Sequence, residues 1–125
     1  MSNIAITPAN LTAFRTATDS AAAAATSAVA NATEVFEFAS NGKPFIVEAS
    51  VADSHGSVAL SLVKGDGWGG KAISIGAAPQ NKVTCFLVES GYGLNSDGKI
   101  EILATPATGK KLYTEHALTL RVYQL

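Results

Sequence analysis

The sequence predicts an all-β fold: an antiparallel β-sandwich of jelly-roll type, with seven or eight short strands, preceded by an alanine-rich arm. From Thr33 onward, apolar and polar residues alternate at a period of two, which is the pattern of strands with one face on a core. Turn signals rich in glycine, proline and asparagine separate these stretches. Residues 1–32, in contrast, form an alanine, serine and threonine tract whose only charged side chains are Arg15 and Asp19. We therefore expect an arm or stalk, residues 1–32, and one β-sandwich domain, residues 33–125.

The arm has two predicted conformations, a helix or an extended chain. Thr7 can cap a helix that begins at Pro8, since proline fits the first helical turn. Apolar residues then recur at steps of three and four, which is the spacing of a coiled-coil seam. Serine, threonine and asparagine make such a helix marginal in isolation, so an extended arm that orders on a neighbour is the alternative. The arm residues expected to contact a partner are Leu11, Phe14, Ala21, Ala25 and Ala28.

The first three predicted strands alternate along their whole length. Glu34–Phe38 places two phenylalanines on one face. Phe45–Val51 places four apolar residues on one face, with Glu48 and Ser50 on the other. Val58–Leu62 repeats the pattern with one valine and two leucines. This one-sided pattern is typical of an antiparallel sheet that covers a core with one face.

The later strands include one that differs from the others. Ile73 and Ile75 begin a strand after a glycine-rich loop. Val83–Glu89 is apolar on both faces, which predicts a central strand with a buried, inert thiol at Cys85. The remaining strands are expected around Ile100 and Ile102, over the short piece Lys110–Tyr113, and over Leu118–Leu125. No helical pattern interrupts them, so an α/β fold is not expected.

Composition excludes several classes of function. The net charge is −1 and no run of Lys or Arg exists to follow a phosphate backbone, so nucleic-acid binding is not expected. One cysteine allows neither an internal disulfide nor a cysteine zinc site. No stretch has the roughly 18 apolar residues of a transmembrane helix. The tripeptide 28–30 fits a signal-peptidase pattern, but Asp19 and the polar tract before it argue against a signal peptide, and we expect synthesis in a cytoplasm. Only 15% of residues are charged, so part of the surface is expected to be covered by a partner or by further copies.

Two aromatic residues stand between glycines and are candidate contact residues. Trp68 lies in a glycine-rich loop that ends in Gly70 and Lys71, but Ala72 replaces the hydroxyl residue that a phosphate-binding loop requires. Tyr92 is flanked by glycine on both sides. Aromatic rings offer a large contact area at low entropic cost, so both residues are suited to a neighbouring subunit or a sugar.

No arrangement of residues predicts catalysis, a metal site or a cofactor site. The run 53–56 contains Asp, Ser and His but is predicted to be a turn, and no GxSxG elbow exists. The run 95–98 begins like a calcium loop, yet no acidic residue closes it, so a turn is expected. His116 is expected at the surface. We therefore expect a protein that is not an enzyme and that holds neither metal nor cofactor.

The alanine, serine and threonine tract Ala21–Ala32, followed by a small sandwich that ends in its own last strand, resembles bacteriophage virion proteins. Among these the chain is most similar to capsid decoration, or cement, proteins. The resemblance implies a protein on the outer capsid surface, often a trimer, whose partners are the major capsid protein or other virion subunits. It carries over no functional residue. The alternatives are a phage fibre or receptor-binding domain, and a carbohydrate-binding module that uses Trp68 and Tyr92.

Overall fold

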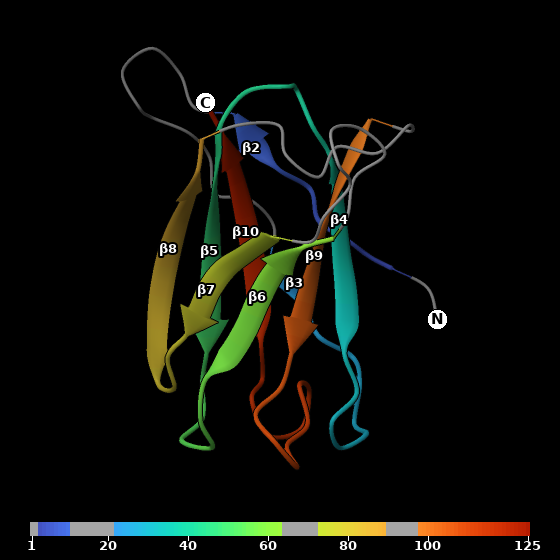
Figure 1. Cartoon of the computed structure of the whole chain (residues 1–125), viewed down its shortest axis with the longest axis vertical. Coiled ribbons are helices and arrows are strands. Elements are labelled where there is room, and N and C mark those ends of the chain that lie inside the picture. The colour runs from blue at the N-terminus through green and yellow to red at the C-terminus, as the bar shows by residue number, and fades with distance from the viewer. Residues whose placement is uncertain (1–2, 11–21, 64–72, 90–97) are drawn as a thin grey trace.

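The computed structural model describes residues 3–10, 22–63, 73–89 and 98–125, which form ten strands in two five-stranded sheets (Figure 1). The first sheet has the order β1-β4-β9-β6-β7, and the second has the order β2-β10-β5-β8, with β3 also paired to β10. The strands are β1 (Ile4–Ala5), β2 (Ala9–Asn10), β3 (Ala23–Ala24), β4 (Glu34–Ala39), β5 (Phe45–Val51), β6 (Val58–Leu62), β7 (Ile73–Ala78), β8 (Lys82–Val88), β9 (Lys99–Thr105) and β10 (Thr119–Gln124). The described residues contain no helix, and so none that could cross a membrane. The predicted all-β class is confirmed.

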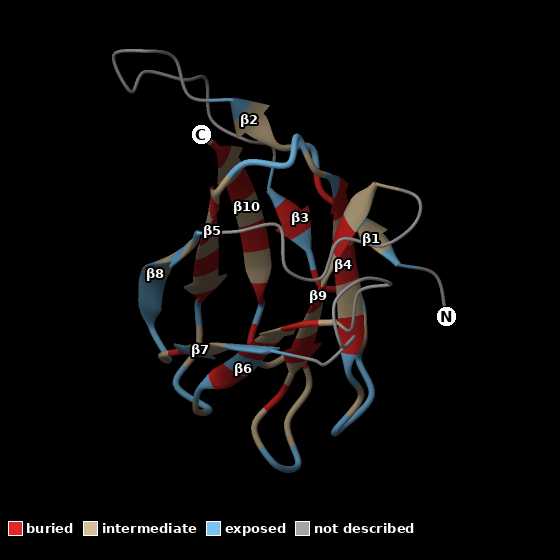
Figure 2. Cartoon of the chain, turned by 45° about the horizontal axis from the view of Figure 1, so that its top comes forward, coloured by how far each residue is buried: buried red, intermediate tan, exposed pale blue. Residues whose placement is uncertain are grey.

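The core lies between the two sheets and contains the residues that the alternation predicted. Every second residue of β5 is buried, and β9 and β10 follow the same rule (Figure 2). Phe38 of the first sheet and Phe45 of the second meet edge to face, with ring centroids 5.0 Å apart and planes at 71°. Such a pair adds roughly 0.5–1.5 kcal/mol to the burial of the two rings. This contact helps to hold the two sheets face to face.

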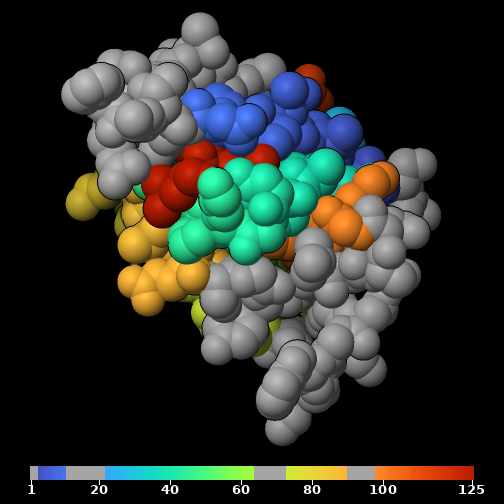
Figure 3. Space-filling view, turned by 90° about the horizontal axis from the view of Figure 1, so that it is seen from above, coloured from blue at the N-terminus to red at the C-terminus, as the bar shows by residue number. Residues whose placement is uncertain are grey.

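The described residues of the arm are built into both sheets. β1 pairs parallel with β4, and the backbone N–H of Ile6 donates to the carbonyl of Glu37 at 2.8 Å. β2 pairs parallel with β10, and seen from the end of the molecule the first residues lie against the C-terminal strand (Figure 3). Ile6, Ala23 and Ala25 are buried in the core. The segment therefore crosses from one sheet to the other between β1 and β2.

The predicted helix that begins at Thr7 and Pro8 is wrong, because Ala9–Asn10 is a strand. The extended alternative agrees with the conformation of the described arm residues. The physical reason is that a short helix rich in serine and threonine is marginal by itself, whereas the open edges of β4 and β10 offer backbone partners.

One buried carboxylate fixes the segment that precedes β4. Glu34 is 3% exposed and accepts hydrogen bonds from the backbone N–H groups of Thr26, at 2.9 Å, and Ser27, at 2.5 Å. The Thr26 hydroxyl donates to the second carboxylate oxygen at 3.0 Å. The Ser27 carbonyl in turn accepts from the N–H of Tyr113 at 3.0 Å. The predicted eighth strand, Lys110–Tyr113, is wrong: Leu112 and Tyr113 lie in a turn, and the piece is joined to the segment before β4 by two backbone hydrogen bonds, from Asn31 to Lys110 and from Tyr113 to Ser27.

Strand β7 contains a bulge next to Gly76. Its register with β6 shifts between Leu60 and Ser61, so that β7 has one extra residue there. Gly76 has φ +145°, and a Cβ at this position would lie 2.9 Å from the Phe86 ring. A glycine is required here because both the backbone angle and the close ring exclude a side chain.

Candidate functional site

The candidate site is the outward face of β8, which we call the β8 strip: Val83, Cys85 and Leu87. Val83 is 61% exposed, Leu87 is 56% exposed, and Cys85 is exposed as well. In Figure 2, β8 is largely pale blue, whereas β5 and β10 alternate between buried and intermediate. The alternate residues Phe86 and Val88 pack against the core instead. β8 thus has one apolar face on the core and a second apolar face on the surface.

Two predictions about this strand are wrong. Val83–Glu89 was expected to be a central strand, but among the residues that the structure describes β8 pairs with β5 alone and lies at the edge of its sheet. Cys85 was expected to be a buried thiol, but it is exposed. Apolar residues on both faces of a strand predict that both faces are buried, but they do not distinguish burial within the chain from burial by a partner. In this chain, the strand's neighbours within the described residues cover only one face.

β8 differs from the other sheet edges of the described structure. β1 and β2 have two residues each, and β7 is interrupted by its bulge. Short strands, bulges and charged side chains are the devices by which natural proteins prevent pairing at an edge. β8 has seven residues, pairs with β5 without a register shift, and has no charged residue between Lys82 and Glu89. It is therefore open to pairing with a further strand.

The neighbouring strands continue the apolar character at one end of the strip. The register places Leu87 beside Ile46 of β5, and Ile46 beside Tyr123 of β10. In the next row, Glu48 of β5 lies between Cys85 and Arg121, with Glu48 Oε1 3.6 Å from the Arg121 guanidinium. This row is polar, so the exposed apolar surface is concentrated along β8 itself.

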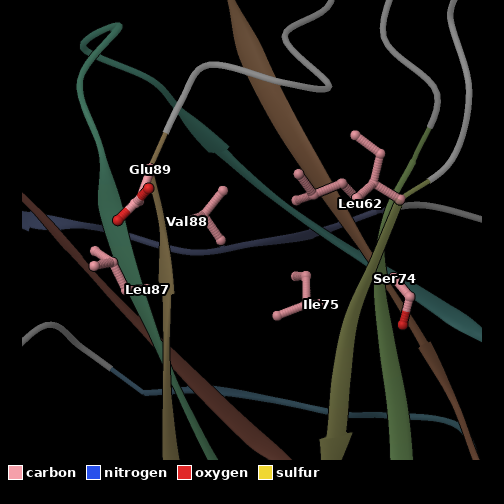
Figure 4. A pocket seen from close by; sticks show the side chains of 7 residues that line it. Leu62, Ser74, Ile75, Leu87, Val88 and Glu89 are labelled. Atoms are coloured by element: carbon pink, nitrogen blue, oxygen red, sulfur yellow. The ribbon is translucent and has the colours of Figure 1, made fainter.

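A groove opens beside the same edge, between β7 and β8 (Figure 4). It has a volume of about 510 Å³. Ile75 and Val88 point toward each other across it from the two strands. Its lining is Leu62, Ile73, Ser74, Ile75, Leu87, Val88 and Glu89. With one hydroxyl and one carboxylate in an otherwise aliphatic lining, the groove suits apolar side chains better than a polar small molecule.

The thiol of Cys85 is poorly suited to nucleophilic chemistry. Partial burial, and then the negative charge of Glu48, raise its pKa above the ordinary value of 9.0. The thiolate is the reactive form of cysteine, so a raised pKa keeps Cys85 protonated and unreactive near neutral pH.

A second cluster joins the turn after β5 to the connection between β9 and β10. His116 was expected at the surface, but it is fully buried, with Nδ1 3.2 Å from Asp53 Oδ1. The backbone N–H of Ala107 donates to His116 Nε2 at 3.3 Å, which assigns the imidazole proton to Nδ1. His55 Nδ1 also contacts Asp53, through Oδ2. A backbone N–H thus occupies the position at which a nucleophile would stand in a catalytic triad, and the cluster holds two loops together.

Asp53 is stabilised as a carboxylate in this cluster. Burial by itself would raise its pKa, but hydrogen bonds from the His116 and His55 side chains and from the His55 backbone outweigh burial and hold the pKa below its ordinary value of 3.8. Among the described residues, no group of three or more His, Cys, Asp or Glu side chains is arranged to hold a metal ion.

The contact residues predicted from sequence are placed in part. Ala25 is 1% exposed and packs inside the chain's own core, with its N–H donating to the Leu118 carbonyl at 2.9 Å. Ala28 is exposed. The others lie outside the described residues: Leu11, Phe14, Ala21, Trp68 and Tyr92. The β8 strip was missed as a site, although the apolar residues on both faces of Val83–Glu89 were the signal for it.

Comparison with protein-family models, with curated protein sequences and with solved structures finds no match for this chain. Any assignment of function therefore depends on the sequence and on the geometry described above.

Proposed function

We propose that this chain is a non-enzymatic structural protein of a bacteriophage virion, which decorates and stabilises the capsid by assembling with other virion subunits through β8. The observation that carries the proposal is an edge strand of seven residues whose outward face is apolar and unpaired within the described structure. An edge of this kind binds another polypeptide by strand addition, with backbone hydrogen bonds for affinity and alternate side chains for specificity. The small, alanine-rich, weakly charged chain fits a protein that is covered when assembled.

The strength of one such contact suits a repeated lattice. Val83 and Leu87 are 61% and 56% exposed, so covering both contributes roughly 2–3 kcal/mol, at about 1.5–3 kcal/mol for each fully buried side chain. That corresponds to a factor of roughly 30–150 in an equilibrium constant. Contacts of this size are weak singly and strong when many copies are held on one shell, because linked contacts multiply their effect.

The test is co-sedimentation of the purified full-length chain with capsids of the phage whose genome encodes it, after the particles have been stripped of the chain. We expect saturable binding, and a loss of roughly 30-fold or more for Val83→Lys. Val29→Lys is the matched control, since Val29 is 66% exposed and belongs to the segment before β4, on the side of the molecule away from β8 (Figure 1). It should bind like the unmodified chain.

Absence of binding by the unmodified chain would refute the capsid proposal. Glycan binding that quenches Trp68 fluorescence, together with no affinity for capsids, would favour the carbohydrate-binding or receptor-binding alternative instead.

A further inference from the structure

The turn between β4 and β5 contains the one place in the sequence where glycine follows asparagine, Asn41 and Gly42. Both residues are exposed, and Gly42 has a φ of +79°. Beyond its two chain neighbours, no atom of the described residues lies within 4 Å of the position that a Cβ of Gly42 would take. The backbone nitrogen of Gly42 is therefore open to the Asn41 side chain, whose amide is among the labile groups of proteins.

Hydrogen bonds hold the reacting groups of this turn in place. Asn41 Oδ1 accepts from the Lys43 N–H at 3.0 Å, so the side chain is folded back over the Gly42 peptide. The same N–H stabilises the negative charge that develops on Oδ1 when the amide carbon is attacked, as a donor of an oxyanion hole does. The Gly42 N–H donates to Ser40 Oγ at 3.0 Å. Because a hydroxyl both accepts and donates, Ser40 can hold this nitrogen before and after it loses its proton.

We propose that Asn41 is a self-modification site, where the chain converts this asparagine to aspartate and isoaspartate through a succinimide, with water as the co-reactant. Hydroxide takes the proton of the Gly42 N–H, and the nitrogen lone pair forms a bond to Asn41 Cγ. The Cγ–Nδ2 bond then breaks, and Nδ2 takes a proton from water and leaves as ammonia, which completes the succinimide ring.

A water molecule opens the ring by adding to one of its two carbonyl carbons. Cleavage of the new bond between Cγ and the Gly42 nitrogen gives aspartate. Cleavage of the original peptide C–N bond gives isoaspartate, in which the main chain runs through Cγ. The reaction needs neither an oxidant nor a second protein, and the inference does not depend on the proposed function.

The modification acts on the contacts that join this turn to the end of β10. Asn41 Nδ2 donates to the Leu125 carbonyl at 3.4 Å, and the Asn41 N–H donates at 2.8 Å to Oε1 of Gln124, which is 4% exposed. The Leu125 N–H donates to the Pro44 carbonyl at 3.0 Å. A carboxylate in place of the amide cannot donate, so two acceptors would face each other at Leu125. Isoaspartate in addition lengthens the main chain inside the turn, so both products should loosen the end of β10.

The first test is peptide mapping by mass spectrometry of the full-length chain during incubation at mildly alkaline pH. We expect position 41 to gain the mass difference between an oxygen atom and an NH group several-fold faster than Asn31 and Asn81. These two asparagines are the matched references, because both are exposed but are followed by Ala32 and Lys82. Isoaspartate among the products identifies the succinimide route, since direct hydrolysis of the side-chain amide gives aspartate alone.

Two comparisons separate the effect of the fold from that of the Asn–Gly sequence. The chain unfolded in guanidinium chloride should be modified at position 41 more slowly than the folded chain, because unfolding removes the hydrogen bonds of Lys43 and Ser40. Ser40→Ala should slow the modification of the folded chain several-fold, and Ser40→Thr, which retains the hydroxyl, should restore the rate. Neither variant should change the rate in the unfolded chain.

The consequence for β10 is measured by hydrogen exchange on the modified fraction, which anion exchange separates because it has gained a negative charge. The amides of Asn41 and Leu125 should lose protection, whereas those of β5 should retain it. Asn41→Asp should reproduce the result for the aspartate product. Asn31→Asp is the matched control, since Asn31 Oδ1 accepts from the Gly109 N–H at 2.6 Å and aspartate retains that acceptor.

Modification at position 41 that is no faster than at Asn31 and Asn81, or that is faster in the unfolded chain than in the folded chain, would overturn the self-modification site. Unchanged exchange of the Asn41 and Leu125 amides in the modified fraction would overturn its effect on β10.

Discussion

Replacing Glu34 by alanine should destabilise the protein by about 3 kcal/mol. The carboxylate is 3% exposed and accepts from the Thr26 and Ser27 backbone N–H groups and from the Thr26 hydroxyl. Alanine would leave two backbone donors without this acceptor, at a cost of roughly 1–3 kcal/mol each. The hydroxyl of Thr26 can turn to water because Thr26 is exposed, so we assign it little of the loss.

The assay is urea and thermal unfolding of the full-length chain. For a domain of this size, 3 kcal/mol corresponds to a fall of roughly 10 °C in Tm. Glu37→Ala is the control on the same strand, since the Glu37 carboxylate contacts the exposed Asn3 amide at 3.3 Å and the Lys99 ammonium at 3.7 Å. Surface contacts of this type are worth less than about 1 kcal/mol.

Hydrogen exchange gives a local measurement of the same effect. The amides of Thr26 and Ser27 should lose protection in Glu34→Ala and retain it in Glu37→Ala. A Glu34→Ala variant within about 0.5 kcal/mol of the unmodified protein, or no less stable than Glu37→Ala, would refute the reasoning. In that case the carboxylate does not hold the segment before β4 in solution.

Three further predictions concern the fold. Ile6→Ala should lower the free energy of unfolding by about 2–4 kcal/mol in urea, and a loss below about 1 kcal/mol would mean that the first residues leave the core in solution. Gly76→Ala should cost about 2 kcal/mol or more, and adding Phe86→Leu should relieve the clash without removing the backbone strain; an unchanged Tm would contradict this. The folded-state pKa of Asp53 is lowered, so its stabilising contribution is present above pH 3.8 and is lost as the pH falls through the folded pKa. The difference in unfolding free energy between the unmodified chain and Asp53→Asn should therefore shrink as the pH falls below 3.8. A difference that stays constant with pH would contradict the lowered pKa of Asp53.

The strands of the β-domain were predictable because local alternation reflects which side chains are buried. The bounds of β5 and β6 match the predicted strands, and β4 extends only one residue further. The alternation works because successive side chains of a strand point to opposite faces whatever the neighbouring strand is.

The cluster around His116 could not be predicted from the sequence. Its partner Asp53 lies 63 residues earlier, and a lone histidine beside charged residues has no periodicity that indicates burial. The conformation of the arm could not be predicted either, because alanine fits a helix, a strand or a packed interface. Its described residues are held by strand pairing with β4 and β10 and by the hydrogen bonds from Thr26 and Ser27 to Glu34.

By itself, the sequence determined the all-β class, the position of most strands and the face that each turns to the core. Only the tertiary structure decided that β8 lies at an edge and that the first residues pair with β4 and β10. The physical reason is that a local pattern records how much of a side chain is buried, whereas strand neighbours are set by backbone hydrogen bonds between distant segments. For β8 the sequence pattern and the tertiary structure disagree, since both faces of the strand are apolar and only one is covered within the described structure.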